Sequence, residues 1–229
     1  SSKLFFKIIF NFLLKIFSLF TNFSNVYFIL QNQSDLDLLS HQMFTNKSKL
    51  QLIKGSGVEL QKLKKYSTAE NFPTFLFASR LIEEKGIIQY IEAANRLNKP
   101  QVQATFLIAG LIDEESPNPI LAETLENSAV EWIGFSDDVN SLIDKCIAVC
   151  LFSSYGEGVP RILLESLARS TPIITTNAPG CEELVDGGKN GILISATDMD
   201  EIEKAFLKLI NSPSHAFELG KSGRKYIEK

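Results

Sequence analysis

The sequence predicts an α/β fold, a Rossmann-like, doubly wound parallel sheet with helices on both faces. Three observations lead to this prediction. Short apolar runs alternate with amphipathic segments from Val26 to the end of the chain. The runs have the length of buried strands and the segments between them have helical spacing, which together indicate parallel strands joined by crossover helices. The 229 residues are 45% hydrophobic and 22% charged, ordinary values for a globular protein that can bury a sizeable core.

The individual elements follow from these runs. The strand candidates are VYFIL at 26–30, LQLI near 50, FLFA near 75, TFLIA near 105, VEWI at 130, IAVCLF near 147, PIITT at 172 and GILI at 191. The crossover helix candidates are GIIQYIEAANRL, NPILAETLE, DVNSLIDKC and PRILLESLARS, and two further helices, DEIEKAFLKLIN and HAFELGKSGRKYIEK, close the chain. The doubly wound sheet is therefore expected from roughly residue 70 onward.

Two regions are expected along the chain. Residues 1–58 have the character of the tail of a preceding domain and its linker, ending in the flexible segment KGSGVEL, and residues 59–229 form the Rossmann-like domain. The chain opens on Ser1 within a helical pattern, so we expect further sequence upstream.

The opening segment KLFFKIIFNFLLKIFSLF has one narrow polar stripe formed by Lys3, Lys7, Asn11, Lys15 and Ser18. No apolar run in it exceeds three residues, so it does not satisfy the criterion for a membrane-spanning helix, and it lacks the cleavage site of a signal peptide. Two interpretations stay open: a helix packed inside the preceding domain, or a lysine-bearing helix that lies in a membrane interface. The expected location is the cytoplasm, at the inner face of the membrane under the second interpretation.

Charge and cysteine usage exclude some classes of protein. The formal charge of -4 and the pI near 5.4 argue against a general nucleic-acid binder, because no basic excess exists to displace phosphate counterions. The three cysteines, Cys146, Cys150 and Cys181, are odd in number and form no C-x-x-C pair, so neither a disulfide framework nor a zinc site is expected. A reducing compartment is the simpler interpretation.

Ligands of such sheets bind at the carboxyl ends of the strands, so the residues that follow each run are the first site candidates. After FLFA come Arg80, which leaves the strand, and Lys85, at the start of the next helix. Two cations and the unpaired N–H groups of a helix start can bind a diphosphate. The alternative is a solvated loop in which Glu83 and Glu84 neutralise both cations.

The segment SYGEGVPRILLE supplies two carboxylates. Glu157 and Gly158 precede Pro160, a residue favoured at the first turn of a helix, and Glu165 lies on that helix. Eight residues of helix place the carboxylates up to about 12 Å apart, which suits two parts of one long ligand, such as a sugar ring and a ribose. The alternative for Glu165 is an exposed helix acid.

Several phrases in succession resemble family-four glycosyltransferases, enzymes of the two-domain GT-B fold that move a sugar from a nucleotide diphosphate with retention of anomeric configuration. The phrases are KGSGVEL, FLFASRLIEEKG, FLIAG with DEESPNPI, VEWIGFSDDV, SSYGEGVPRILLESL and TTNAPGCEELVDGGKNGILI. Each is weakly specific alone, and their order and spacing carry the resemblance. The last helix and strand of the family's amino-terminal, acceptor-side domain would precede them.

The resemblance implies a role for each charged candidate. The family's diphosphate-binding cations correspond to Arg80 and Lys85, and its paired glutamates to Glu157 and Glu165. Glu157 would then contact the donor sugar and, with the two cations, form the catalytic group, while Glu165 would bind the ribose hydroxyls.

The resemblance also implies contacts made by less polar residues. The backbone of Gly158, Val159 and Pro160 would contact the sugar or phosphate, and Ile133, Gly134 and Phe135 would line the base pocket. UDP is the expected nucleotide. DEESPNPI and the PGC phrase are most similar to members that extend polyprenyl-diphosphate-linked oligosaccharides in capsule, O-antigen or protein-glycan assembly, so the expected partners are a nucleotide sugar and a glycan or lipid-linked acceptor.

Some positions depart from the family's pattern. Ser79 stands where many relatives have Gly, Gly156 where an Arg is common, and Arg169-Ser170 replace a small pair that ends in Gly. Neither His41 nor His215 matches the active-site His of the family's amino-terminal domain; both have the setting of ordinary surface histidines.

Two D-x-D sequences, Asp35-Leu36-Asp37 and Asp198-Met199-Asp200, open amphipathic segments after Ser34 and Thr197, where acids satisfy unpaired N–H groups. We therefore interpret them as helix caps and expect no metal and no cofactor. The rival functions are a GT-B-like epimerase or phosphorylase and an inactive nucleotide-sugar-binding module. An epimerase would need an acid–base residue near the sugar, and these loops contain no histidine; a dehydrogenase would need a strand leading into G-x-G-x-x-G.

Overall fold

The computed structural model describes residues 8–9, 12–13, 15–16, 18–20, 25–42, 47–60 and 72–229. The chain divides into two compact units, Ser1–Ser56 (unit 1) and Gly57–Lys229 (unit 2). The boundary that the sequence predicts, between 58 and 59, lies close to this division. That unit 1 belongs to an acceptor-side domain stays a prediction.

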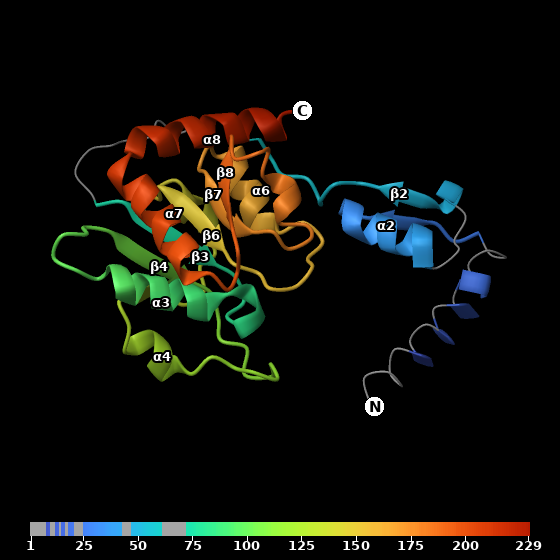
Figure 1. Cartoon of the computed structure of the whole chain (residues 1–229), viewed down its shortest axis with the longest axis horizontal. Coiled ribbons are helices and arrows are strands. Elements are labelled where there is room, and N and C mark those ends of the chain that lie inside the picture. The colour runs from blue at the N-terminus through green and yellow to red at the C-terminus, as the bar shows by residue number, and fades with distance from the viewer. Residues whose placement is uncertain are drawn as a thin grey trace. The chain divides into compact units, whose positions relative to one another are not determined.

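Unit 2 contains a six-stranded sheet in which every pairing is parallel. Its strands are β3 (Thr74–Ala78), β4 (Thr105–Ala109), β5 (Glu131–Trp132), β6 (Ala148–Leu151), β7 (Ile173–Thr176) and β8 (Gly191–Ile194). The spatial order is β5-β4-β3-β6-β7-β8, so the sheet grows one way from β3 and then the other way from β6 (Figure 1). This is the strand order of the Rossmann fold, and the predicted fold class is confirmed.

The predicted helices are all present in unit 2. They are α3 (Ile87–Leu97), α4 (Ala122–Glu126), α5 (Val139–Ile143), α6 (Arg161–Ala168), α7 (Met199–Asn211) and α8 (Pro213–Ile227), with the 3-10 turns η2 (Glu83–Lys85) and η3 (Glu182–Leu184). Helix α4 is shorter than predicted because Pro119 forms an antiparallel bridge with Ile82. This bridge keeps the residues just before α4 out of the helix. The edge strand β5 is also shorter than VEWI, since only two of its residues pair with β4.

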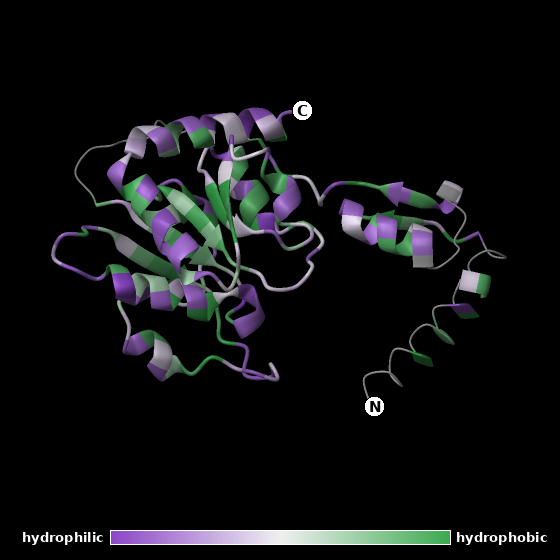
Figure 2. Ribbon diagram, viewed as in Figure 1, coloured by the Kyte–Doolittle hydropathy of each residue, from purple (hydrophilic) through white to green (hydrophobic). Residues whose placement is uncertain are grey.

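The core forms where the two faces of the sheet meet the helices. All residues of β6 and β7 are buried, as expected for parallel strands covered on both faces. The Tyr90 ring packs against Phe77, Phe106 and Phe206, and its hydroxyl donates to Phe75 O at 2.9 Å. Figure 2 shows the apolar strands at the centre of the unit and polar residues on the outer faces of the helices.

Unit 1 contains a small parallel pair of strands, β1 (Phe28–Leu30) and β2 (Leu50–Leu52), with Phe28 opposite Leu50. They are connected through α2 (Gln33–Gln42) and the 3-10 turn η1 (Lys47–Lys49). The strands predicted at 26–30 and near 50 are therefore present, although the first is shorter than expected.

The predicted opening helix is helical at each described residue between 8 and 20. Lys3, Lys7 and Asn11, which belong to its expected polar stripe, lie outside the described residues. Ser18 departs from that stripe because it is buried, whereas Phe20 is 72% exposed. Among the described residues, none of the helices is long and apolar enough to cross a membrane.

The two D-x-D sequences lie at helix starts. Asp198 is the N-cap of α7, and its Oδ1 accepts from the N–H groups of Asp200 (3.0 Å) and Glu201 (3.1 Å), as the capping interpretation predicts. At α2 the cap is Asn32 rather than an acid: its Oδ1 accepts from Asp35 N at 2.7 Å, and its amide donates to the Asp35 carboxylate. The helix starts at Gln33, two positions earlier than the expected start at Asp35, because the Asn32 side chain provides both bonds.

Candidate functional site

A cavity of about 1320 Å³ opens beyond the carboxyl ends of the strands in unit 2. Strands β3 and β6 are neighbours there, while the chain leaves β3 toward β4 and leaves β6 toward β7. This divergence is the topological switch point, where doubly wound sheets bind ligands. Its lining includes Ser79, Arg80, Gly110, Asp113, Phe135, Tyr155, Arg161 and Glu165.

Arg80 reaches into this cavity from the end of β3. Its side chain is 62% exposed, and its Nη1 lies 3.1 Å from Oδ2 of Asp113, which is 23% exposed. The N–H of Glu115 donates to the other Asp113 oxygen at 3.2 Å, so the carboxylate is the fixed partner. The expected partners of the alternative interpretation, Glu83 and Glu84, are not the ones that pair with Arg80. Sequence reasoning missed Asp113, although its place after β4, at the same sheet edge, was the available signal.

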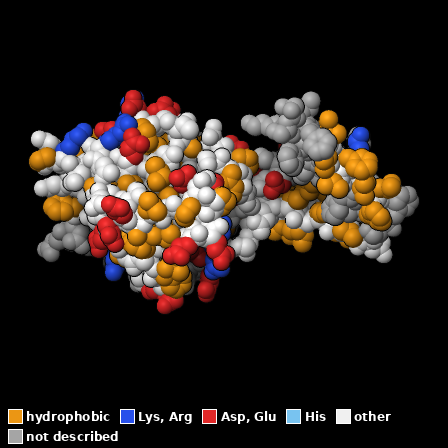
Figure 3. Space-filling view, turned by 90° about the horizontal axis from the view of Figure 1, so that it is seen from below, with side chains coloured by type: hydrophobic (Ala, Val, Ile, Leu, Met, Phe, Trp, Pro, Cys, Tyr) orange, Lys and Arg blue, Asp and Glu red, His pale blue; other side chains and the backbone are white. Residues whose placement is uncertain are grey.

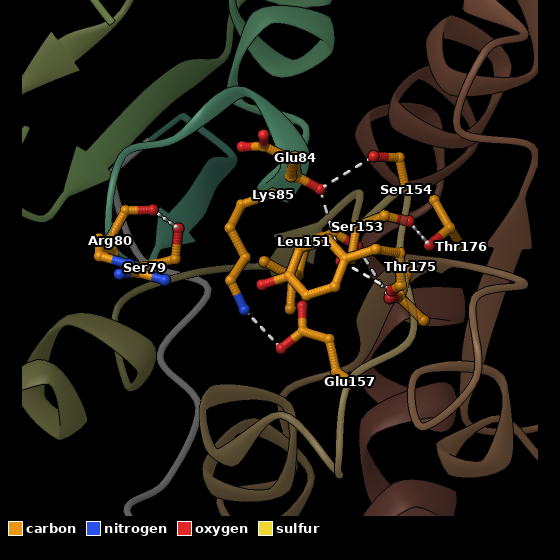
Figure 4. Close-up of polar contacts among 11 residues, drawn as sticks. Ser79, Arg80, Glu84, Lys85, Leu151, Ser153, Ser154, Glu157, Thr175 and Thr176 are labelled. Atoms are coloured by element: carbon orange, nitrogen blue, oxygen red, sulfur yellow. Dashed lines mark hydrogen bonds and ion pairs between the residues drawn. The ribbon is translucent and has the colours of Figure 1, made fainter. Parts of the chain in front are cut away.

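Lys85 has a different environment from Arg80 (Figure 4). Its Nζ lies 2.5 Å from Oε2 of Glu157, and the two side chains are only 15% and 10% exposed. The Tyr155 ring lies 5.3 Å from the same Nζ and also lines the cavity. The sequence predicted that both cations face one anion; in this structure Arg80 lines the cavity, while Lys85 pairs with Glu157 and lies over the Tyr155 ring.

Main-chain contacts bring Lys85 and Glu157 together. Phe152 N donates to Lys85 O at 3.2 Å and Ser154 N donates to Glu84 O at 2.9 Å, so the loop after β6 rests on the loop after β3. Gly86 makes this possible, since its φ is 80° and a Cβ there would lie 2.3 Å from Phe152 O.

Glu165 projects from α6 into the cavity, and its side chain is 17% exposed. Its Oε1 accepts from Arg161 Nε at 2.7 Å, one helical turn earlier. Glu165 is thus not the exposed helix acid of the alternative interpretation. Arg161, 77% exposed at the cavity mouth, is a further cation that sequence reasoning did not single out.

The less polar candidates divide between the cavity and its surroundings. Phe135 lines the cavity and is 66% exposed, while Ile133 and Gly134 lie beside it without lining it. Gly134 O accepts from Gly110 N at 2.7 Å, which fixes this loop to the end of β4. The remaining candidates lie immediately before α6; they are Gly158, Val159 and Pro160. Pro160 occupies the N-cap position before Arg161, the first residue of the helix.

Cysteines and possible metal ligands were the remaining candidates for chemistry. Cys146, Cys150 and Cys181 are free and buried. The described residues contain no cluster of three or more side chains suited to a metal ion. On the face of unit 2 in Figure 3, acidic side chains are interspersed with apolar ones, and Lys and Arg form no broad patch there.

A model of the family described as "Glycosyl transferases group 1" matches residues 58–226, nearly all of unit 2. The chain belongs to this family. The matched range contains every site candidate described above, from Arg80 to Glu165.

Related proteins agree with this assignment. EpsD of Bacillus subtilis (strain 168) is 32% identical over 172 residues, which cover 74% of this chain and 45% of EpsD. The N,N'-diacetylbacillosaminyl-diphospho-undecaprenol alpha-1,3-N-acetylgalactosaminyltransferase of Campylobacter jejuni is 24% identical over 85% of this chain and 54% of its own length. The chain thus spans about half the length of these curated relatives.

Solved structures of low sequence identity share the fold. Alr3699/HepE of Anabaena, solved in complex with UDP-glucose, has a TM-score of 0.78 at 21% identity, over 95% of this chain and 63% of that protein. This likeness supports the GT-B type of architecture independently of the strand order.

Proposed function

We propose that the full-length protein is a retaining glycosyltransferase that transfers a hexose or N-acetylhexosamine from a UDP-sugar to a glycan or polyprenyl-diphosphate-linked acceptor in cell-surface polysaccharide or glycan synthesis. The observation that carries the proposal is the cavity at the switch point of a glycosyltransferase-family domain, with Arg80 and Glu165 in its wall.

The donor follows from the chemistry of that wall. Arg80 offers a guanidinium that suits a diphosphate, and Glu165 offers carboxylate oxygens that suit vicinal ribose hydroxyls. Phe135, with Ile133 and Gly134 beside it, provides an apolar surface for a base. The Anabaena relative in fold was solved with UDP-glucose, which supports a UDP-sugar here.

The transfer step is assigned to the Lys85–Glu157 pair and Arg80. Glu157 orients the donor sugar, and the cations stabilise the charge that grows on the leaving diphosphate as the glycosidic bond breaks. The backbone of Gly158, Val159 and Pro160, at the start of α6, contributes contacts to sugar or phosphate. We propose no metal ion in this step.

The acceptor and the location are inferred from the relatives. The Campylobacter relative acts, by its name, on a diphospho-undecaprenol-linked sugar, and another relative is named for capsular polysaccharide biosynthesis in Staphylococcus aureus. With a lipid-linked acceptor, the location that we propose is the inner face of the cytoplasmic membrane. The apolar opening segment that contains Phe12 and Phe20, both exposed, would support peripheral contact there.

Transfer by the full-length protein tests this function. UDP-glucose, UDP-galactose, UDP-N-acetylglucosamine and UDP-N-acetylgalactosamine are each supplied with a polyprenyl-diphosphate-linked saccharide, and the product is examined by mass spectrometry and proton NMR. We expect one donor to give a glycosylated lipid with the α-configuration of the donor. A β-linked product contradicts retention, and UDP-sugar binding without product indicates a binding module instead.

A further inference from the structure

The loop after β7 bears directly on the backbone that carries Glu157. Gly180 has a φ of 84°, and a Cβ built on it would lie 2.1 Å from Gly158 O and 2.4 Å from Glu157 O. Pro179 O accepts the N–H of Glu157 at 2.9 Å. The carbonyls of Glu157 and Gly158 therefore face the bare α-carbon of Gly180, an approach that any side chain would prevent.

This approach determines where the neighbouring N–H groups point. The peptide bonds after Glu157 and Gly158 are trans, and in a planar trans peptide the N–H is directed opposite to the C=O. With both carbonyls turned toward Gly180, the N–H groups of Gly158 and Val159 are turned away from it. The same contact fixes the start of the Glu157 side chain, whose carboxylate lies 2.5 Å from Lys85 Nζ.

We propose that Gly180 is a positioning residue for sugar transfer. Its missing side chain lets residues 157–158 rest on residues 179–180, and this contact fixes the Glu157 carboxylate beside Lys85 and aims two backbone donors. The inference rests on the proposed function, because it assigns Gly180 to the step in which Glu157 orients the sugar. Gly180 acts through that loop and does not itself contact the donor.

The test compares Gly180→Ala with Gly188→Ala in the full-length protein. Gly188 is the matched control, since its φ is 78° but a Cβ there would have nothing within 4 Å, and it lies in the turn before β8, at the opposite end of the sheet. Both variants place an alanine at a positive φ, and only G180A adds a clash between the new Cβ and the carbonyl oxygens of Glu157 and Gly158. We expect G180A to keep UDP affinity within about threefold and to lose turnover on the order of 100-fold, the cost of a misplaced reacting group.

A double-mutant cycle separates positioning from a general structural effect. In the Glu157→Gln background, the fold-loss of turnover caused by G180A should be less than about a fifth of the loss that G180A causes in the unaltered protein. Equal losses in both backgrounds, or a turnover of G180A within threefold of G188A, overturn the proposal. If G180A does not fold, Pro179→Gly provides a second test, because it loosens the same segment without adding an atom. This variant should also lower turnover while UDP affinity is retained. A Pro179→Gly protein with unchanged turnover would contradict the proposal.

A structural readout distinguishes this inference from the proposed function. Crystals of G180A should show the Glu157 carboxylate moved out of reach of Lys85 Nζ, whether or not any UDP-sugar is a substrate. A pair that stays at its present 2.5 Å overturns the positioning role. Absence of transfer by the unaltered protein, together with a displaced carboxylate in G180A, would count against the proposed function alone.

Discussion

The four charged site candidates are all in ion pairs, but their exposure differs. Arg80 and Asp113 meet at the open cavity, where Arg80 is 62% exposed, whereas Lys85 and Glu157 are at most 15% exposed. A solvated Arg can exchange its carboxylate for an incoming diphosphate at little cost. A largely buried pair is harder to separate, because removing one partner leaves the other charge uncompensated.

These environments predict different effects of substitution. Arg80→Ala should weaken UDP binding by roughly 10- to 150-fold, as expected for a charged contact of about 1.5 to 3 kcal/mol, and should lower turnover further. Glu165→Gln should mainly weaken UDP binding, and Glu157→Gln should lower turnover with little change in UDP affinity. Calorimetry with UDP and steady-state rates provide the two measurements. Equal losses of UDP affinity in the two Glu variants would contradict the division of roles.

Ser170 is the non-glycine residue with a left-handed backbone in the described part of the chain, at φ 62°. Its carbonyl packs against Gly220, where a Cβ would lie 1.9 Å from it, so the backbone cannot relax. Ser170→Gly should raise the free energy of unfolding by up to about 1 kcal/mol. The substitution removes the strain of the left-handed backbone, and the greater conformational entropy of Gly in the unfolded chain offsets part of that gain. Ser222→Gly, inside α8, should instead lower the melting temperature. A Ser170→Gly protein that melts lower would refute the prediction.

The buried thiols give stability an alkaline limit. Burial raises the pKa of Cys181 from 9.0 to about 12, with a smaller contribution from the nearby Glu157 charge. The folded state therefore keeps the neutral thiol while the unfolded state ionises, so this stability is complete below pH 9 and is lost between pH 9 and about 12. Urea midpoints should fall less steeply from pH 8 to 10 in Cys181→Ala than in the unaltered protein. Parallel slopes in the two proteins would show that the thiol is not the cause.

At the scale of elements, sequence predicted the type of each helix and strand better than its ends. Helices α3 and α7 have continuous amphipathic patterns and lie where the patterns do. The ends depend on contacts between distant residues, such as the bridge of Pro119 with Ile82 that shortens α4. The same reason applies to the site. Arg80 and Glu165 were predicted from their positions after strands, but the Arg80–Asp113 ion pair joins two loops that are distant in sequence, so no local pattern predicts that the two side chains meet.

Helix capping predicts a result for metal dependence. Oδ1 of Asp198 accepts from two N–H groups of α7, so this D-x-D sequence serves as a helix cap. Activity of the full-length protein should survive EDTA, and Asp198→Ala should cost about 1 kcal/mol of stability without changing turnover. Thermal melts and transfer rates measure the two effects. Activity that is lost in EDTA and restored by magnesium or manganese would contradict this interpretation.

For the molecule as a whole, the parallel sheet was predictable because buried parallel strands need both apolar runs and helices between them. The strand order was not visible in any run, and it is this order that makes β3 and β6 neighbours and places the loops after them side by side. The two units also show how far pattern reasoning extends. The flexible segment KGSGVEL led to a predicted boundary between residues 58 and 59, whereas the assignment of residues 1–58 to an acceptor-side domain came from the resemblance alone and stays a prediction.

The loops around the site rest on one another through main-chain atoms. The loop after β6 hydrogen-bonds to Lys85 O and Glu84 O, and the loop after β7 holds the N–H of Glu157. Such a frame requires glycine at positions 86 and 180, where a Cβ would meet the facing backbone, and its hydrogen bonds do not involve the side chains of the other loop residues. Positions such as Ser79 and Gly156, where this chain differs from the family's usual residues, can therefore vary during evolution without moving the frame. A substitution at Ser79, which lines the cavity, can therefore change the shape of the cavity while the main-chain hydrogen bonds between the loops stay in place.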